Sequence, residues 1–67
     1  MNVMINGEDY VVPKHVKTIR ELVDHIGFDS PVIIAEHNGT ILQKEEHQTA
    51  MVNTGDQIEF IQFVGGG

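Results

Sequence analysis

Residues 18–27 read Thr-Ile-Arg-Glu-Leu-Val-Asp-His-Ile-Gly, and this stretch decides the fold class. Thr18 and Glu21 have the spacing of a capping box, in which each side chain bonds a free backbone N–H at the start of a helix. Four apolar residues recur at helical spacing and form one stripe, namely Ile19, Leu22, Val23 and Ile26. Gly27 is suited to end the helix in the left-handed conformation. The sequence predicts one helix over residues 19–26, which is too short to be stable alone and must pack on a sheet.

Two strands are predicted before the helix, over residues 2–6 and about 9–12. Asn6-Gly7 separates them and is a strong signal for a hairpin turn, because both residues accept a positive φ. Pro13 ends the second strand, since proline has no N–H to donate to a neighbouring strand. We therefore expect an antiparallel hairpin at the start of the chain.

The chain after the helix predicts further strands. Residues 32–35 form an apolar run that is typical of an interior strand, and Asn38-Gly39 marks a turn before a short apolar segment at 41–42. Residues 43–48 are polar and predict a loop or a single helical turn, and residues 49–52 predict a short edge strand.

A strand pair, one helix and more strands together predict an α+β roll. We expect a mixed sheet of four to five strands with the one main helix packed on one face. Residues 1–64 are expected to form a single domain, followed by a flexible glycine tail over residues 65–67.

The last predicted strand, residues 57–64, is rich in β-branched and aromatic residues. Side chains alternate between the two faces of a strand, and acidic Glu59 is unsuited to the core, so Ile58 and Phe60 should face the helix. Apolar residues on the uncovered face then form a docking patch for a partner, unless a loop covers them. The predicted docking residues, which lie beside the tail, are Glu59, Ile61, Phe63 and Val64.

Gly65, Gly66 and Gly67 follow this strand directly. Glycine has the widest backbone freedom and no side chain, so such a tail can enter a narrow channel in another protein. A partner that uses ATP can activate the carboxylate of Gly67 as an acyl-adenylate. A sulfur donor would then leave a thiocarboxylate, and a lysine would leave an isopeptide bond. Short glycine tails also occur as cloning scars or as frayed ends without function.

The composition narrows the classes of function. Sixty-seven residues fit one domain, and a net charge of −6 argues against nucleic-acid binding, which needs clustered Lys and Arg. There is no cysteine, which excludes a disulfide or a thiolate metal site. No stretch has the length and apolarity of a membrane span, and no signal peptide is visible. We expect a cytoplasmic protein that is a monomer when free.

The residues give little evidence for metal binding, phosphate binding or catalysis by the chain itself. The four histidines match no metal-ligand spacing and are expected to be exposed polar residues: His15, His25, His37 and His47. No phosphate-binding loop or nucleophile motif occurs. A chain this short is also expected to leave little room for a ligand pocket of normal size. We expect neither an active site of the chain's own nor a bound cofactor or metal.

A set of short motifs occurs in a fixed order along the whole chain. These are Asn6-Gly7, Thr18-Ile19-x-x-Leu22-Val23, the apolar strand ending near Asn38, Ile41-Leu42 with Lys44, Gly55-Asp56-x-Ile58-Glu59, and Phe63-Val64-Gly65-Gly66-Gly67. With them the chain resembles the ThiS family, the sulfur carriers of thiamine (thiazole) biosynthesis. More broadly it is similar to the ubiquitin-like β-grasp group that includes the molybdopterin carrier MoaD.

The resemblance implies a carrier and not an enzyme. A ThiF-like enzyme would use ATP and Mg²⁺ to adenylate Gly67, and sulfur from cysteine, passed on by a cysteine desulfurase, would make the thiocarboxylate. The charged carrier would then dock on a ThiG-like thiazole synthase and donate its sulfur. Three alternatives stay open: a MoaD-like carrier for molybdopterin or another sulfur-transfer pathway, a ubiquitin-like protein modifier, and a binding module with an inert tail.

Overall fold

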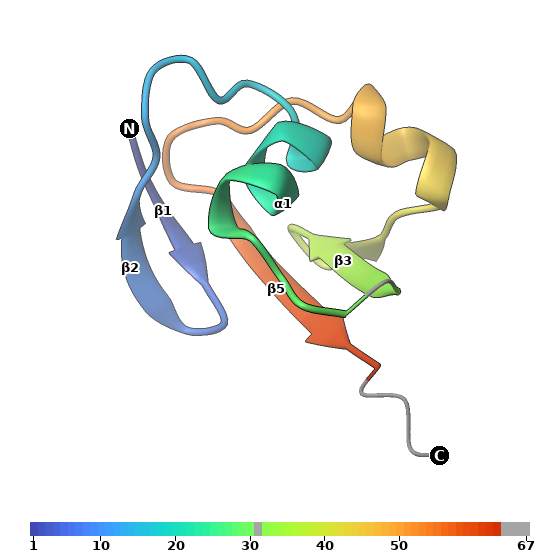
Figure 1. Ribbon diagram of the computed structural model, residues 1–67. Coiled ribbons are helices and arrows are strands. Elements are labelled where there is room, and N and C mark those ends of the chain that lie inside the picture. Colours follow the sequence, from blue (N-terminus) through green and yellow to red (C-terminus); the bar gives the residue numbers. More distant parts are fainter. Residues whose placement is uncertain (31, 64–67) are drawn as a thin grey trace.

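The computed structural model describes residues 1–30 and 32–63. Two strands, β1 (Asn2–Ile5) and β2 (Glu8–Val11), precede the helix α1 (Ile19–Ile26). Strands β3 (Ile33–His37) and β4 (Thr40–Ile41) follow, then the 3₁₀ helix η1 (Lys44–Gln48) and the last strand β5 (Gln57–Gln62). Figure 1 shows α1 lying across one face of the sheet.

The strands form one five-stranded sheet in the order β2-β1-β5-β3-β4. The first and last strands of the chain, β1 and β5, are parallel neighbours, with Met4 opposite Gln57 and Ile5 opposite Ile58. The other neighbouring strands are antiparallel. The prediction of an α+β β-grasp roll, with a mixed sheet and one main helix on one face, is confirmed.

The helix α1 begins at the predicted capping box. The Glu21 N–H donates to Thr18 Oγ1 at 3.1 Å, and the Thr18 N–H donates to Glu21 Oε1 at 3.0 Å. The backbone N–H groups of Lys17 and Thr18 lower the pKa of the Glu21 carboxyl, because they stabilise its charged form. Gly27 ends the helix as predicted, with a φ of 78°, and its N–H donates to the Val23 carbonyl at 3.1 Å.

The core lies between α1 and the sheet. Ile19 and Leu22 on α1 and Ile58 and Phe60 on β5 are all buried, so the predicted orientation of β5 is confirmed. The ring of Phe28, just after the helix, meets Phe60 edge-on with 5.2 Å between centroids. Full burial of an aliphatic or Phe side chain contributes about 1.5–3 kcal/mol, so packing holds this short helix in place.

The predicted edge strand over residues 49–52 is wrong. An isolated bridge between Met51 and Thr18 is the only strand-like pairing described there. The segment instead bonds the chain leading into α1, because the Ile19 N–H donates to the Ala50 carbonyl and the Val52 N–H donates to the Lys17 carbonyl. These backbone bonds join residues 49–52 to the start of the helix and not to the sheet edge.

The structure agrees with the prediction for the stretch 43–48 and differs from it at the end of the last strand. The polar stretch 43–48 contains one short helix, η1, which agrees with the predicted helical turn. The last strand was predicted to reach Val64, but β5 ends at Gln62, because its partner β3 begins at Ile33, directly opposite. Val64 and the predicted tail over residues 65–67 lie outside the described residues.

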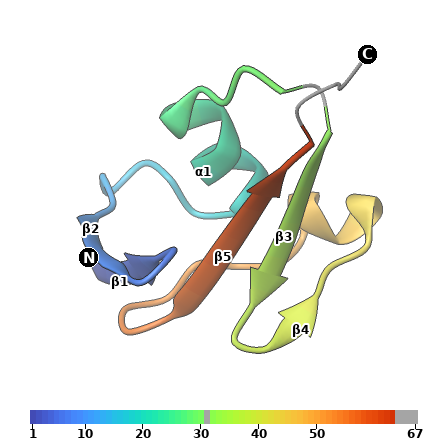
Figure 2. The same cartoon turned by 90° about the horizontal axis from the view of Figure 1, so that it is seen from below.

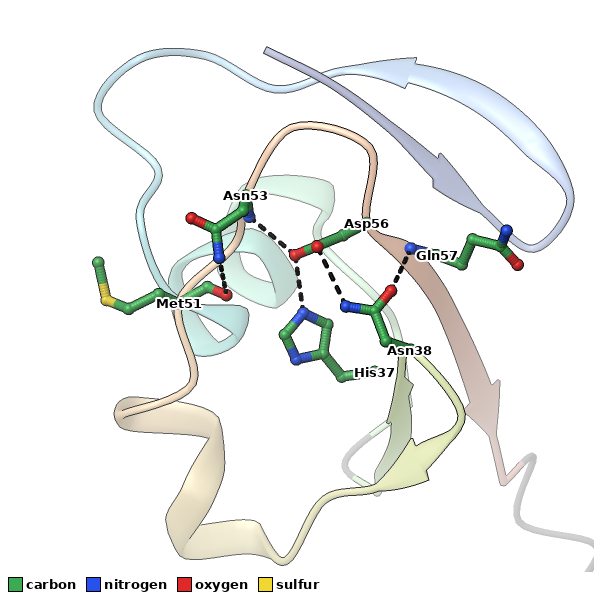
Figure 3. Close-up of polar contacts among 6 residues, drawn as sticks. All are labelled: His37, Asn38, Met51, Asn53, Asp56 and Gln57. Atoms are coloured by element: carbon green, nitrogen blue, oxygen red, sulfur yellow. Dashed lines mark hydrogen bonds and ion pairs between the residues drawn. The ribbon is translucent and has the colours of Figure 1, made fainter.

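A polar network fixes the start of β5 (Figure 3). The Asp56 carboxylate accepts hydrogen bonds from the Asn53 N–H at 2.8 Å and from Asn38 Nδ2 at 3.1 Å, and it lies 2.7 Å from His37 Nε2. Burial alone would raise the pKa of the Asp56 carboxyl, but the hydrogen bonds from these three residues outweigh it and lower the pKa. Asn38 also accepts from the Gln57 N–H at 2.8 Å, which joins the β3–β4 turn to β5.

The expectation that all four histidines are exposed is wrong for two of them. His37 shares the core-facing side of β3 with Ala35, because alternate residues of a strand point the same way. His47 is 9% exposed, since η1 packs against α1. His15 and His25 are exposed, and their rings meet edge-on with centroids 5.9 Å apart.

Candidate partner-docking face

The sheet face opposite α1 is open over β3 and β5. Figure 2 shows these two strands with no other described segment in front of them. Ile61 is 53% exposed and Phe63 is 54% exposed, although both are large and apolar. The structure therefore places them on the uncovered face, as the strand alternation predicts, and no described loop covers them.

Three apolar side chains that were not predicted as docking residues share this face. Ile34 lies opposite Ile61 in the β3–β5 register, and Ile41 on β4 is 65% exposed. Val32 is 52% exposed, and its carbonyl accepts from the Phe63 N–H at 3.3 Å. The apolar run of β3 indicated a strand buried on both faces, so its outward residues went unrecognised. We call these five residues the open-face patch: Val32, Ile34, Ile41, Ile61 and Phe63.

An acidic pair borders the open-face patch. Glu36 on β3 and Glu59 on β5 lie directly opposite each other in the antiparallel register. A hydrogen bond to the Glu59 carboxyl raises the pKa of Glu36, because two adjacent carboxyl groups favour sharing a proton over two negative charges. A cationic side chain of a partner would relieve the repulsion between them, so the pair favours a basic partner surface.

Ser30 holds the chain where β5 ends. Its hydroxyl oxygen lies 2.7 Å from the Phe63 carbonyl oxygen and 3.0 Å from the Val32 carbonyl oxygen, and its one proton can bond either. The same oxygen accepts from the Val32 N–H at 3.3 Å. These contacts attach the last described residue to the loop before β3. No sequence motif marked Ser30, because the contact spans 33 residues of chain.

The predicted site residues fall into two groups. Glu59, Ile61 and Phe63 lie together on the outward side of the chain at and just beyond β5, as predicted. Val64, Gly65, Gly66 and Gly67 lie outside the described residues, so their roles stay predictions.

Residues 1–30 and 32–63 also bear on a metal site and a membrane span. In this part of the chain, no group of three or more His, Asp or Glu side chains is arranged to hold a metal ion. None of its helices combines the length and the apolarity that crossing a membrane requires.

Known proteins match most or all of this chain. A protein named ycf40 from Trieres chinensis is 30% identical over 63 residues, which cover 94% of this chain and 85% of that protein. A thiazole synthase from Paramagnetospirillum magneticum is 34% identical over all 67 residues, which make up only 20% of that larger protein.

A solved structure gives the same fold. The crystal structure of the thiamine biosynthesis protein ThiS from Geobacter metallireducens matches with a TM-score of 0.82 and 30% identity, and the match covers both chains completely. The solution structure of a thiamine biosynthesis protein from the same organism matches with a TM-score of 0.80 over the whole of this chain and 88% of that one. The model of the ThiS family matches residues 2–67. This chain therefore belongs to the ThiS family.

Proposed function

We propose that this chain is a sulfur carrier in the making of the thiazole ring of thiamine, and that the carboxylate of Gly67 is its working group. The ThiS family match over residues 2–67 carries the proposal, because it spans both the described fold and the glycine tail. The thiamine biosynthesis protein with a TM-score of 0.82 supports the same role.

The proposed chemistry takes place in the active sites of partners. A ThiF-like enzyme binds ATP and Mg²⁺, and the Gly67 carboxylate attacks the α-phosphate to give an acyl-adenylate and pyrophosphate. A sulfur nucleophile, supplied indirectly by a cysteine desulfurase, then displaces AMP and leaves a thiocarboxylate. The carrier contributes the tail and the surface that brings the tail to the enzyme. It needs no cofactor and no catalytic residue of its own.

The described residues support docking next to the tail. The open-face patch reaches the end of β5, and apolar side chains that are exposed together favour contact with a partner. Glu36 and Glu59 add negative charge at its border, which suits a basic partner surface and mainly raises the rate of association. Because Ser30 fixes Phe63, docking on this face determines where the following glycines begin.

A thiazole synthase is the proposed sulfur acceptor. The thiazole synthase of Paramagnetospirillum magneticum contains a stretch that is 34% identical to this whole chain. A carrier-like segment within a thiazole synthase indicates that the two work together, and we extend that pairing to this chain.

One added residue tests the proposal. We expect that appending alanine after Gly67 abolishes thiazole formation in a mixture of ThiF-like enzyme, thiazole synthase, ATP and a sulfur donor, because the carboxylate then belongs to another residue. The matched control carries the alanine before Met1. It should support thiazole formation at the rate of the original chain, and both variants should melt at the same temperature.

The outcomes separate the alternatives. Thiazole formation that is undiminished by the alanine after Gly67 would refute a role for the Gly67 carboxylate. If the unextended chain gives no thiazole but becomes joined to lysine side chains, it is a ubiquitin-like modifier. If it supports sulfur transfer only to a molybdopterin precursor, it is a MoaD-like carrier.

A further inference from the structure

A groove of about 620 Å³ runs along the sheet edge beyond β3, between α1, β4 and η1. Its lining includes Ile33 and Leu42, which pack toward the core, and Ile34 and Ile41, which belong to the open-face patch. A cavity lined from both faces of a sheet lies at the edge of that sheet. Its volume also corrects the expectation that so short a chain leaves little room for a pocket of normal size.

Part of the β3 edge at this groove lacks a strand partner. Figure 2 shows β4 beside only the end of β3, where Glu36 and His37 pair with Ile41 and Thr40. The Leu42 N–H extends this contact by donating to the Ala35 carbonyl at 2.9 Å. The Val32 carbonyl bonds toward β5 through the Phe63 N–H, and bonding directions alternate along a strand. The N–H and C=O of Ile33 therefore point into the groove, where no described strand reaches them.

The charge at the groove is opposite to that of the whole chain. The chain carries four Lys and Arg residues and a net charge of −6. Two of those four, Arg20 and Lys44, line the groove, and Asp24 is the only acidic side chain among the described residues that line it. Arg20 Nε lies 3.3 Å from Asp24 Oδ2 in an exposed pair, which is a weak contact. The groove is thus a cationic site on an acidic protein.

We propose that this groove binds an extended, acidic segment of a partner protein, which adds as a strand beside Ile33. Backbone bonds to a free sheet edge give such segments their affinity, and alternate side chains fit pockets on the two faces. One set would lie against Phe28 and Leu42, and the other against Ile41. Carboxylates of the segment would meet Lys44 and Arg20. A second copy of this chain is a poor occupant, since both copies carry −6.

This proposal goes beyond the proposed function. The groove needs neither Gly67 nor a thiocarboxylate, although two of its lining residues, Ser30 and Val32, also contact Phe63 at the end of β5.

An NMR titration of the whole chain tests the groove directly. The probe is the blocked peptide acetyl-Glu-Val-Thr-Val-Thr-Val-Glu-amide, and the control peptide has both glutamates replaced by lysine. We expect saturable shifts at the amides of Ile33, Leu42 and Lys44, with slowed hydrogen exchange at the Ile33 N–H. The lysine peptide should bind more weakly.

Two variants with the same charge change separate the groove from the net charge. Lys44→Glu should weaken binding of the acidic peptide about three- to tenfold, as expected when an exposed ion pair becomes a repulsion. Lys14 is exposed and lies outside the groove lining, so Lys14→Glu should leave the affinity for the acidic peptide unchanged. An equal loss in both variants would overturn the proposal. So would shifts confined to Ile61 and Phe63, no saturable shift, or dimerisation that occupies the groove without peptide.

Discussion

Two asparagines in the turns of this protein form hydrogen bonds with β5, the strand that carries part of the docking face. Asn38 forms part of the Asn-Gly turn between β3 and β4, and its side chain also bonds the Gln57 N–H and the Asp56 carboxylate. Asn6, in the other Asn-Gly turn, accepts from the Phe60 N–H at 2.8 Å. Both asparagines have a positive φ, near 50°. Each therefore makes a turn and also extends the hydrogen bonding of β5 beyond its strand partners.

Replacing Asp56 tests how much its hydrogen bonds stabilise the fold. Asp56→Asn removes a buried carboxylate that accepts three hydrogen bonds, so we expect a loss of about 1–3 kcal/mol in the free energy of unfolding at neutral pH. Because the folded pKa of Asp56 is lowered, its stabilisation is present above its ordinary pKa and is lost as pH falls through the folded pKa.

The difference between the original chain and Asp56→Asn should therefore shrink only as the pH falls below the ordinary pKa of an aspartate, about 4. Urea unfolding at several pH values measures it. Glu21, with a lowered pKa, and Glu36, with a raised one, are common to both proteins and cancel in this difference. A gap that stays constant with pH would show that the Asp56 carboxylate does not stabilise the fold through these bonds.

At the scale of elements, the helix α1 packs on the sheet and completes the core although it has only eight residues. Its capping box fixes where it starts, and its buried face, centred on Ile19 and Leu22, packs into the core against the sheet. We expect Thr18→Ala to lower the free energy of unfolding by about 1 kcal/mol, the usual cost of losing such a cap.

Thr18→Ser is the matched control, since serine keeps the hydroxyl that accepts from the Glu21 N–H. It should recover most of the stability lost in Thr18→Ala when both are unfolded in urea. Equal losses in the two variants would mean that the Thr18 methyl group matters and its hydroxyl does not.

The elements that could be predicted from the sequence are those whose signals lie within a few neighbouring residues. The helix has a capping box, an apolar stripe and a terminal glycine within ten residues, and the Asn-Gly turns are equally local. The errors lie where distant residues decide. Residues 49–52 form backbone hydrogen bonds with the chain before α1, and His37 on the core side of β3 meets its partner Asp56, which lies 19 residues away. The outward residues of β3 were missed because an apolar run alone does not show which of its faces is covered.

At the scale of the whole molecule, one side of the sheet builds the core and the other remains open for docking. The helix covers one face, and the open-face patch on the other reaches the end of β5. Ile61 contributes little to the core, so replacing it by Asp should affect docking much more than folding. The proposed carrier thus keeps its stabilising residues and its working residues on opposite faces.

The most direct test is intact-mass spectrometry of the chain after incubation with a ThiF-like enzyme, ATP, Mg²⁺ and a sulfur donor. We predict a mass increase equal to replacing one oxygen by sulfur, mapped to Gly67. It should form more slowly in Ile61→Asp, while a matched exposed variant away from the face, Lys14→Asp, should react normally. No mass change in the original chain, with an enzyme shown to charge another carrier, would contradict the account.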